Sequence, residues 1–206
     1  VRRNSLDDFD NIQSNGKIAM KLDAADRIVA VRICTEQDDI LLSAHGGKCG
    51  RFPTTDVGVF KGRSSQGVRG MKLADGDEVI SMSILRHIEL DTDERDAYLR
   101  WATRQRRDED GEEGGAATDV EFGTERGTML GATEEFILAI TENGYGKRTS
   151  AYEYRITKRG GQGIINIETS KRNGAVINAF PVASGDQIML ITDSGDVAAV
   201  SSLLEI

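Results

Sequence analysis

The stretch RITKRGGQGIINI, residues 155–167, places two cations directly before three glycines in four residues and then a short apolar run. Related stretches occur as SNGKIAM at 14–20, SQGVRGM at 65–71 and GQGIINI at 161–167. Their glycines, Gly16, Gly67 and Gly163, are separated by 51 and 96 residues. A pattern that returns at a regular interval indicates a repeat architecture.

A second pattern gives the same interval. An apolar run, a turn with glycine and another strand-like run occur as ILLSAHGGKCGRF (40–52), FILAITENGYGKRT (136–149) and IMLITDSGDVAAV (188–200). Their turn glycines, Gly47, Gly144 and Gly195, are separated by 97 and 51 residues. Both patterns therefore indicate a pitch of 51 residues, with one interval lengthened by 45 or 46. We predict one domain over 1–206, with repeats at about 1–50, 51–146 and 147–196, a truncated fourth at 197–206, and an insertion at 87–133.

Each repeat holds about four short strands. The third repeat shows them as KRTSAYEYRI (147–156), QGIINIET (162–169), GAVINAFPVA (174–183) and QIMLITD (187–193). Asn-Gly at 143–144 and 173–174 is a strong hairpin signal, because both turn residues must accept positive φ. Four strands in every 40 to 50 residues are typical of propeller blades. A β-sandwich is the structural alternative, but it needs no fixed pitch, so we predict an all-β, propeller-like array.

The insertion differs from the repeats in composition. Residues 91–107 carry acidic side chains in the first turn and arginines in the last, which favours a helix because the charges oppose its dipole. Residues 108–119, DEDGEEGGAATD, are typical of a flexible, solvated segment. One interpretation is a tethered helix and loop on a blade edge. The alternatives are a helix that docks a partner, or an acidic segment that competes with a polyanion for basic side chains.

Charge leaves the choice of partner open. The net charge of −8 argues against nucleic acid. However, residues 87–133 hold 13 acidic and 6 basic residues, while the rest of the chain holds 21 and 20. The repeats are therefore close to neutral, and their cations can gather on one rim.

Cations recur at equivalent points of the repeat. One set follows the hairpin turn, a second precedes the glycine turn, and Lys171 with Arg172 precedes an Asn-Gly turn. Glycine lets a turn present amide groups close to an anion, and flanking cations favour phosphate. We predict that the phosphates of a polyanion contact Arg2, Arg3, Arg51, Lys61, Arg63, Lys147, Arg148, Lys158, Arg159, Lys171 and Arg172, and that Gly160, Gly161 and Gly163 form phosphate-facing turns.

No residues point to catalysis or to a metal. Cys34, His45 and Cys49 match no zinc spacing, and two cysteines in a chain of this length suggest reduced thiols rather than disulfides. Two histidines support no Ser/His/Asp set, and the four tyrosines have no catalytic neighbours in the sequence: Tyr98, Tyr145, Tyr152 and Tyr154. We expect no cofactor, no leader peptide and no membrane span, and we expect the chain to be a piece of a longer protein.

NGYGKRT (143–149), RGGQGIINI (159–167) and QIMLITDSG (187–195) together resemble the C-terminal domain of the bacterial DNA gyrase A subunit, part of a type IIA topoisomerase. Residues 2–22 and 51–73 resemble other blades of that domain. The resemblance implies a β-pinwheel, whose blades share strands with their neighbours and whose basic perimeter wraps duplex DNA. A family disc has about six blades, so this chain supplies about half of one. KRGGQG at 158–163 lacks the leading glutamine-arginine pattern of the gyrase A box, and we do not assign it as that box.

The resemblance also implies a role. This part of the enzyme is expected to be non-catalytic and to bend DNA without sequence preference, in support of ATP-dependent negative supercoiling. ATP and Mg²⁺ would act elsewhere in a cytoplasmic, nucleoid-associated A2B2 complex, which also contains the rest of the gyrase A chain and the gyrase B chain. The alternatives are the corresponding domain of topoisomerase IV and a protein-binding propeller, and an enzyme site in a central channel is a more distant one.

Overall fold

The computed structural model describes residues 1–110, 122–195 and 197–201, with side chains described for 1–107 and 122–195. The chain forms two compact units. The first comprises Val1–His87, Ala139–Lys147 and Ile156–Phe180, and the second comprises Ile88–Leu138, Arg148–Arg155 and Pro181–Ile206.

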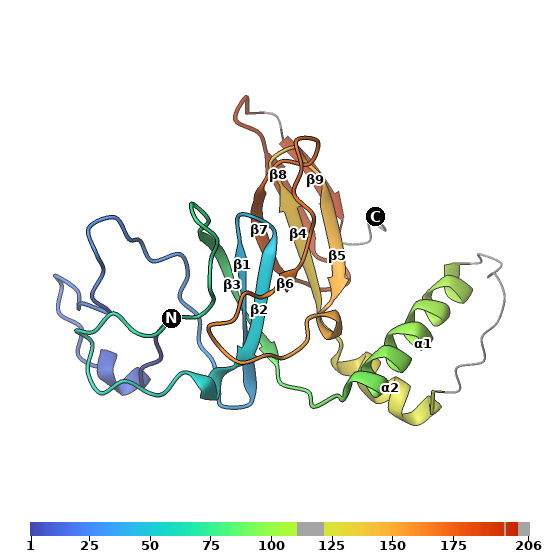
Figure 1. Ribbon diagram of the computed structural model, residues 1–206, viewed down its shortest axis with the longest axis horizontal. Helices are drawn as coiled ribbons and strands as arrows, with labels where there is room; N and C mark the ends of the chain where they lie inside the picture. The colour runs from blue at the N-terminus through green and yellow to red at the C-terminus, as the bar shows by residue number, and fades with distance from the viewer. Residues whose placement is uncertain (111–121, 196, 202–206) are drawn as a thin grey trace. The chain divides into compact units, whose positions relative to one another are not determined.

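A four-stranded sheet dominates the first unit. Its order is β3-β1-β2-β6, formed by β1 (Asp38–Ala44), β2 (Lys48–Pro53), β3 (Val79–Arg86) and β6 (Ile164–Ile165) (Figure 1). Strands β1 and β2 form a hairpin in which Ile40 faces Phe52 and Leu42 faces Gly50. Ile40, Leu42, Phe52, Val57 and Met71 form the core. Burial of these side chains from water is the main stabilising contribution to this unit.

Strand β6 comes from a later repeat of the chain. Its residues Ile164 and Ile165 pair with Cys49 and Lys48 of β2. Two isolated bridges also join separate repeats: Arg3 pairs with Val59 and Arg51 pairs with Ile156, both in parallel orientation. Sharing of strands between repeats, as the family resemblance implies, is therefore present in this unit.

The other sheets are smaller. One has the order β5-β4-β7, with β4 at Phe136–Thr141, β5 at Gly146–Ser150 and β7 at Val176–Val182, and the other joins β8 (Gln187–Ile191) to β9 (Val197–Ser201). The Asn-Gly turn between β4 and β5 has Gly144 at φ +79°, which agrees with the hairpin prediction. The described part of the chain also includes three 3₁₀ helices: η1 (Leu6–Phe9), η2 (Thr54–Asp56) and η3 (Ala151–Glu153).

The strand-like runs after the glycine turns behave differently in the three copies. GQGIINI contains β6, but neither SNGKIAM nor SQGVRGM contains a regular strand. In the second copy Val68 donates its N–H to the carbonyl of Val1, without a continuing ladder. The sequence pattern therefore predicts the turn, whereas a strand also needs a paired neighbour to supply its hydrogen bonds.

The described residues of the insertion form two helices, α1 (Thr92–Asp110) and α2 (Thr124–Thr133), which lie beside one another in Figure 1. The predicted helix is confirmed as α1, and Asp91 caps it by accepting the N–H of Glu94 at 2.8 Å. Helix α2 was not predicted. Segment 108–119 was expected to be flexible. Its first three residues form the end of α1, and the rest of it lies outside the described residues.

The helices have a core of their own within the second unit. Tyr98, Ala102, Leu130 and Tyr152 are buried together, and the rings of Tyr98 and Tyr152 meet edge to face with centroids 5.3 Å apart. Tyr152 belongs to η3, after the insertion, so the helices share a hydrophobic core with residues outside the insertion and are not only attached at a blade edge. In the part of the chain that is described, no helix has the length and apolar character to span a membrane.

Candidate nucleic-acid interface

Three arginines occupy one repeated position. Arg3, Arg51 and Arg148 each stand three residues before a 3₁₀ helix. We predicted that this position faces outward toward DNA. The structure instead uses each of the three guanidinium groups inside its own unit.

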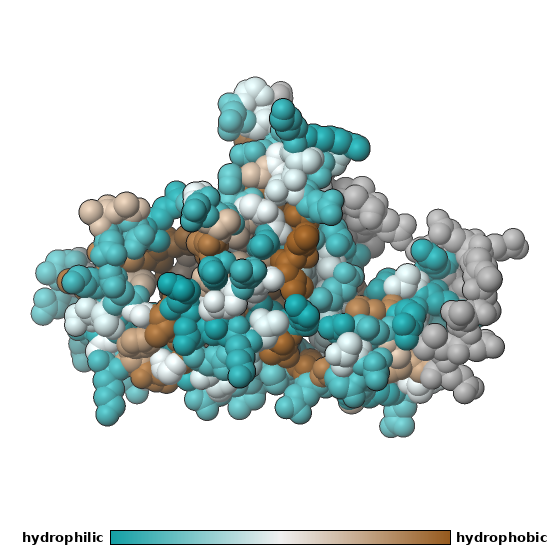
Figure 2. Space-filling view, viewed as in Figure 1, coloured by the Kyte–Doolittle hydropathy of each residue, from teal (hydrophilic) through white to brown (hydrophobic). Residues whose placement is uncertain are grey.

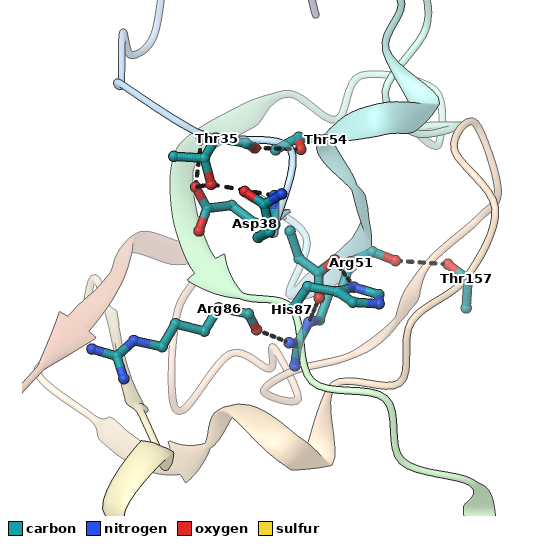
Figure 3. A network of polar contacts seen from close by, with 9 residues as sticks. Thr35, Asp38, Arg51, Thr54, Arg86, His87 and Thr157 are labelled. Carbon is teal, nitrogen blue, oxygen red and sulfur yellow. Dashed lines mark hydrogen bonds and ion pairs between the residues drawn. The ribbon is translucent and has the colours of Figure 1, made fainter.

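Arg51 is buried, and its predicted place on the outer rim is wrong. Its side chain is 3% exposed, and its Nε lies 2.8 Å from the Oδ2 of Asp39, which is itself fully buried. Arg51 also donates to the carbonyl of Arg86 at 2.8 Å, and His87 Nδ1 lies 2.7 Å from the other oxygen of Asp39 (Figure 3). A charge buried in this way requires a partner, because desolvation would otherwise strongly destabilise the fold.

Arg148 and Arg3 also lie against the protein. Arg148 is half-buried, with its guanidinium 4.0 Å from the centroid of the Phe136 ring. Arg3 is 15% exposed, donates to the carbonyl of Val57 at 2.8 Å and lies 3.5 Å from Glu36. These arginines hold the chain together at the entrance to each 3₁₀ helix, and neither is freely presented to a ligand.

Arg2 and Arg63 bind neighbouring backbone. Arg2 donates to Ser65 and to the carbonyl of Gly62, and its guanidinium lies 4.9 Å from the Phe60 ring. Arg63 donates to the carbonyl of Ile18 at 3.3 Å. Both therefore link loops of the first unit, and only part of each guanidinium remains for an anion.

The repeated glycines serve close packing. Gly163 has φ +74°, and a Cβ there would lie 2.3 Å from the carbonyl oxygen of Cys49. Gly67 has φ +100°, and its Cβ would lie 2.4 Å from the oxygen of Val1. Only glycine allows two segments of the backbone to approach so closely at positive φ. The glycine turn after the cations therefore lets the chain of one repeat lie against the backbone of an earlier repeat.

The same packing uses backbone groups of the turn that we expected to face phosphate. Gly160 donates its N–H to the carbonyl of Gly70 at 2.7 Å, and the carbonyl of Gly161 accepts from Lys72 at 2.8 Å. The Gly160 amide is therefore occupied, and the predicted phosphate-facing role for this residue does not hold.

These contacts bring cations together. Hydrophilic side chains cover most of the face in Figure 2, so exposure alone distinguishes no single cation. Arg159 donates its Nη1 to the carbonyl of Arg69 at 2.5 Å and its Nε to the carbonyl of Asp56 at 3.1 Å. Arg69, Lys72 and Lys158 are exposed beside this junction. We call Arg69, Lys72, Lys158 and Arg159 the cation cluster.

Sequence analysis missed half of this cluster. Arg69 and Lys72 lie in SQGVRGMKL (65–73), and neither is among the cations predicted to contact phosphate. The sequence carried no signal for these two residues, because it is a tertiary contact, the pairing of the chain around Gly160 with the chain around Gly70, that brings them to the cluster. The one carboxylate that the cluster contacts within the described residues is Asp56, whose Oδ2 accepts the Arg159 N–H at 3.3 Å.

The remaining predicted cations are exposed. Lys61 stands 97 residues before Lys158, the spacing of the equivalent turn glycines. Lys147 lies near Cys49: burial raises the pKa of the Cys49 thiol to about 12, and the charge of Lys147 partly opposes this effect. Lys171 and Arg172 lie on an exposed turn, and Arg172 donates to the hydroxyl of Tyr145 at 2.8 Å.

Comparison with known proteins identifies the family. A family model described as "DNA gyrase C-terminal domain, beta-propeller" matches residues 1–35, 38–86 and 135–183. The chain belongs to the DNA gyrase C-terminal domain family.

Named relatives agree with this assignment. The DNA gyrase A subunit of Granulibacter bethesdensis is 49% identical over 97% of this chain, and that of Rickettsia bellii is 47% identical over 95%. The chain spans 23% and 22% of the lengths of these two proteins. A DNA gyrase A C-terminal domain structure covers 91% of this chain and 48% of its own, with a TM-score of 0.61 and 22% identity. A topoisomerase IV C-terminal domain structure covers 89% of this chain and 43% of its own, also with a TM-score of 0.61, at 18% identity.

The resemblance seen in the sequence is therefore confirmed, and so is the propeller-like, all-β fold. The structural similarity supports the fold alone, whereas the sequence relatives support membership of the gyrase family. The repeat boundaries and the extent of the insertion remain predictions, although the family match stops at residue 86 and resumes at 135.

The other candidate residues of this gyrase domain lie in the interior or pair locally. Tyr98, Tyr152 and Tyr154 are buried, and Tyr145 is 38% exposed. Within the described ranges, no group of three or more His, Cys, Asp or Glu side chains is arranged to hold a metal ion. Cys34 and Cys49 are both free thiols.

Proposed function

We propose that this gyrase-family domain binds duplex DNA through its phosphates and bends it. The observation that carries the proposal is the cation cluster, in which residues from two repeats, 90 positions apart, are joined by the Arg159–Arg69 hydrogen bond. Three of its four side chains are exposed, and Asp56 is the one carboxylate that it contacts among the described residues. A group of cations with so few contacting carboxylates is better placed to bind several phosphates of a polyanion than to form one salt bridge within the protein.

The cluster supports binding without sequence preference. Its cations lie in irregular segments between strands, where they can meet a phosphate backbone but do not enter a groove. Contacts of this kind fix the position of a duplex and carry no base information. We therefore expect similar affinity for duplexes of any sequence and a steep dependence on salt.

The proposed effect of this surface on bound DNA is to bend it. A bend of 40–90° in a short duplex costs on the order of 1–6 kcal/mol, which phosphate contacts must offset. In a complete gyrase, DNA held in this way would present a segment to the rest of the enzyme with one handedness, so that strand passage introduces negative supercoils. The domain would perform no chemistry and use no cofactor, while ATP and Mg²⁺ act elsewhere in an A2B2 assembly with the gyrase B chain.

The test removes exposed cations that make no essential internal contact. The variant Arg69→Gln/Lys72→Gln/Lys158→Gln should bind a duplex of about 40 base pairs several-fold more weakly at low salt. The slope of log K against log salt should fall by up to about 2.7, since each lost phosphate contact removes roughly 0.9. Fluorescence anisotropy over a salt series measures both quantities.

The control is Arg95→Gln/Arg126→Gln in the second unit, whose guanidinium groups lie 2.7 Å from Asp96 and Glu94. It should leave the salt slope unchanged. Unchanged affinity and slope in the triple variant, in protein of normal stability, would refute the cation cluster as the DNA surface. Bending is measured separately by ring closure of a duplex close to one persistence length, about 150 base pairs, which the domain should accelerate.

A further inference from the structure

Two Asn-Gly turns lie against one another in the first unit. We call residues 141–145 and 170–175 the paired turns. Asn143 donates its backbone N–H to the carbonyl of Asn173 at 3.2 Å, and Glu142 donates to Ala175 at 2.9 Å. The Asn143 side chain donates to the carbonyl of Arg172 at 2.8 Å. The backbone that carries Arg172 is therefore held from the neighbouring turn.

The second turn is also fixed from within. Gly174 has φ +77°, and a Cβ there would lie 2.8 Å from the Cβ of Glu142, so the turns are in close contact. Asn173 is held by two further hydrogen bonds, because its N–H donates to the Ser170 hydroxyl and its side chain donates to the carbonyl of Glu168. This turn consequently presents Lys171 and Arg172 from a rigid support.

The guanidinium of Arg172 is oriented by Tyr145. Its Nε donates to the tyrosine hydroxyl at 2.8 Å, and its central carbon lies 5.0 Å from the ring centroid. This hydrogen bond raises the pKa of Arg172. The terminal nitrogens Nη1 and Nη2 bond to nothing within residues 1–107 and 122–195, whose side chains are described. Both residues are exposed, so that edge of the guanidinium is open to a ligand.

We propose that Tyr145 is a positioning residue that aims Arg172 at one backbone phosphate, which Nη1 and Nη2 grip as a pair. The planar fork of arginine matches two oxygens of a phosphate, and parallel hydrogen bonds of this kind are stronger than single ones. Holding the fork in place before binding reduces the ordering cost of association. The inference rests on the proposed function, and it assigns that function's most specific contact to the paired turns.

The surroundings favour an anion. Lys171 adds a second exposed cation on the same turn. The nearby carboxylate of Glu142 is already engaged, since its Oε2 accepts the N–H of Ala175 at 2.9 Å and its Oε1 lies 3.7 Å from His45. The acid therefore contributes to turn structure and does not compete for Arg172.

The test compares charge with orientation in the full chain, by anisotropy with a random-sequence duplex over a salt series. Arg172→Gln should lose about tenfold in affinity, and its salt slope should fall by about 0.9. Arg172→Lys should keep the slope but recover little of the affinity, because an ammonium has no fork. Tyr145→Phe should weaken binding about threefold at an unchanged slope, since the charge remains.

A double-variant comparison isolates the positioning role. Tyr145→Phe should add nothing to Arg172→Gln, whereas its effect should multiply with that of the control Lys61→Gln. Without DNA, nuclear magnetic resonance should show faster exchange of the Arg172 Nε proton in Tyr145→Phe. The inference would be overturned if Tyr145→Phe exchanged the Arg172 Nε proton at the rate of the unaltered chain, or bound DNA with the affinity of the unaltered chain. Failure of the unaltered chain to bind any duplex would instead overturn the proposed function, whereas full binding by Arg172→Gln would refute only this contact.

Discussion

Phe136 follows Asp39 by 97 residues, and Arg148 follows Arg51 by the same interval. In one repeat the arginine meets a buried carboxylate at 2.8 Å, and in the other it stacks on a phenyl ring at 4.0 Å. The repeat thus keeps an arginine before each 3₁₀ helix while its partner changes from a charge to a π face. Both partners compensate for desolvation of the guanidinium, by ion pairing or by cation–π attraction.

The Asp39–Arg51 pair is expected to control stability rather than DNA affinity. Asp39→Asn or Arg51→Gln should lower the free energy of unfolding by about 3–5 kcal/mol, because each leaves a buried charge without its partner. Urea titration measures this loss. Arg69→Gln is the matched surface control and should change stability by less than about 0.5 kcal/mol. A small loss in both interior variants would show that water reaches the pair.

Alanine substitutions at Gly163 and Gly16 distinguish the cost of backbone strain from the cost of steric contact. Both have positive φ, at +74° and +77°, but nothing lies within 4 Å of a Cβ at Gly16. Gly16→Ala should therefore cost only the backbone term, about 1–2 kcal/mol. Gly163→Ala should cost about 1–3 kcal/mol more, because its Cβ would meet the Cys49 carbonyl. Equal losses in urea unfolding would contradict the close-packing role of the repeated glycine.

Tyr98 should make the domain sensitive to alkali. Burial is the main cause that raises the pKa of Tyr98, and the charge and hydrogen bond of Glu134 raise it further. The folded state therefore retains a proton that the unfolded chain releases near pH 10. Stability from this group is fully present below about pH 10 and declines as the pH rises toward the folded value, by up to about 1.4 kcal/mol per pH unit.

The comparison variant is Tyr98→Phe, studied by urea unfolding between about pH 8 and pH 11, a range that spans the ordinary tyrosine pKa. It should be less stable at the lower pH by about 1–3 kcal/mol, because Glu134 loses a hydrogen bond of 2.8 Å while its side chain is 5% exposed. Its decline above about pH 10 should be shallower than that of the unaltered chain. Parallel curves would assign the alkaline transition to other groups.

The sequence by itself determined the repeat, the all-β class and the local turns. Gly144 takes the positive φ that its Asn-Gly dipeptide requires, and α1 forms where the charges of 91–107 suit a helix. These features depend on neighbouring residues, so a linear pattern carries them. Helix α2 was missed because its ten residues show no comparable charge signal, and its buried Leu130 is stabilised by Tyr98 and Tyr152 from elsewhere in the chain.

Only the tertiary structure decided which cations face outward. Arg51 lies on a strand that is paired on both edges and buried through Cys49–Phe52, so no alternation of polar and apolar residues marks its environment. Conversely, Arg69 and Arg159 meet because the chain around Gly160 pairs with the chain around Gly70, 90 residues earlier. A lysine or arginine can be either buried against a partner or exposed, since its long side chain reaches a buried acid, an aromatic ring or the solvent equally well. The choice depends on partners that only the folded chain brings near.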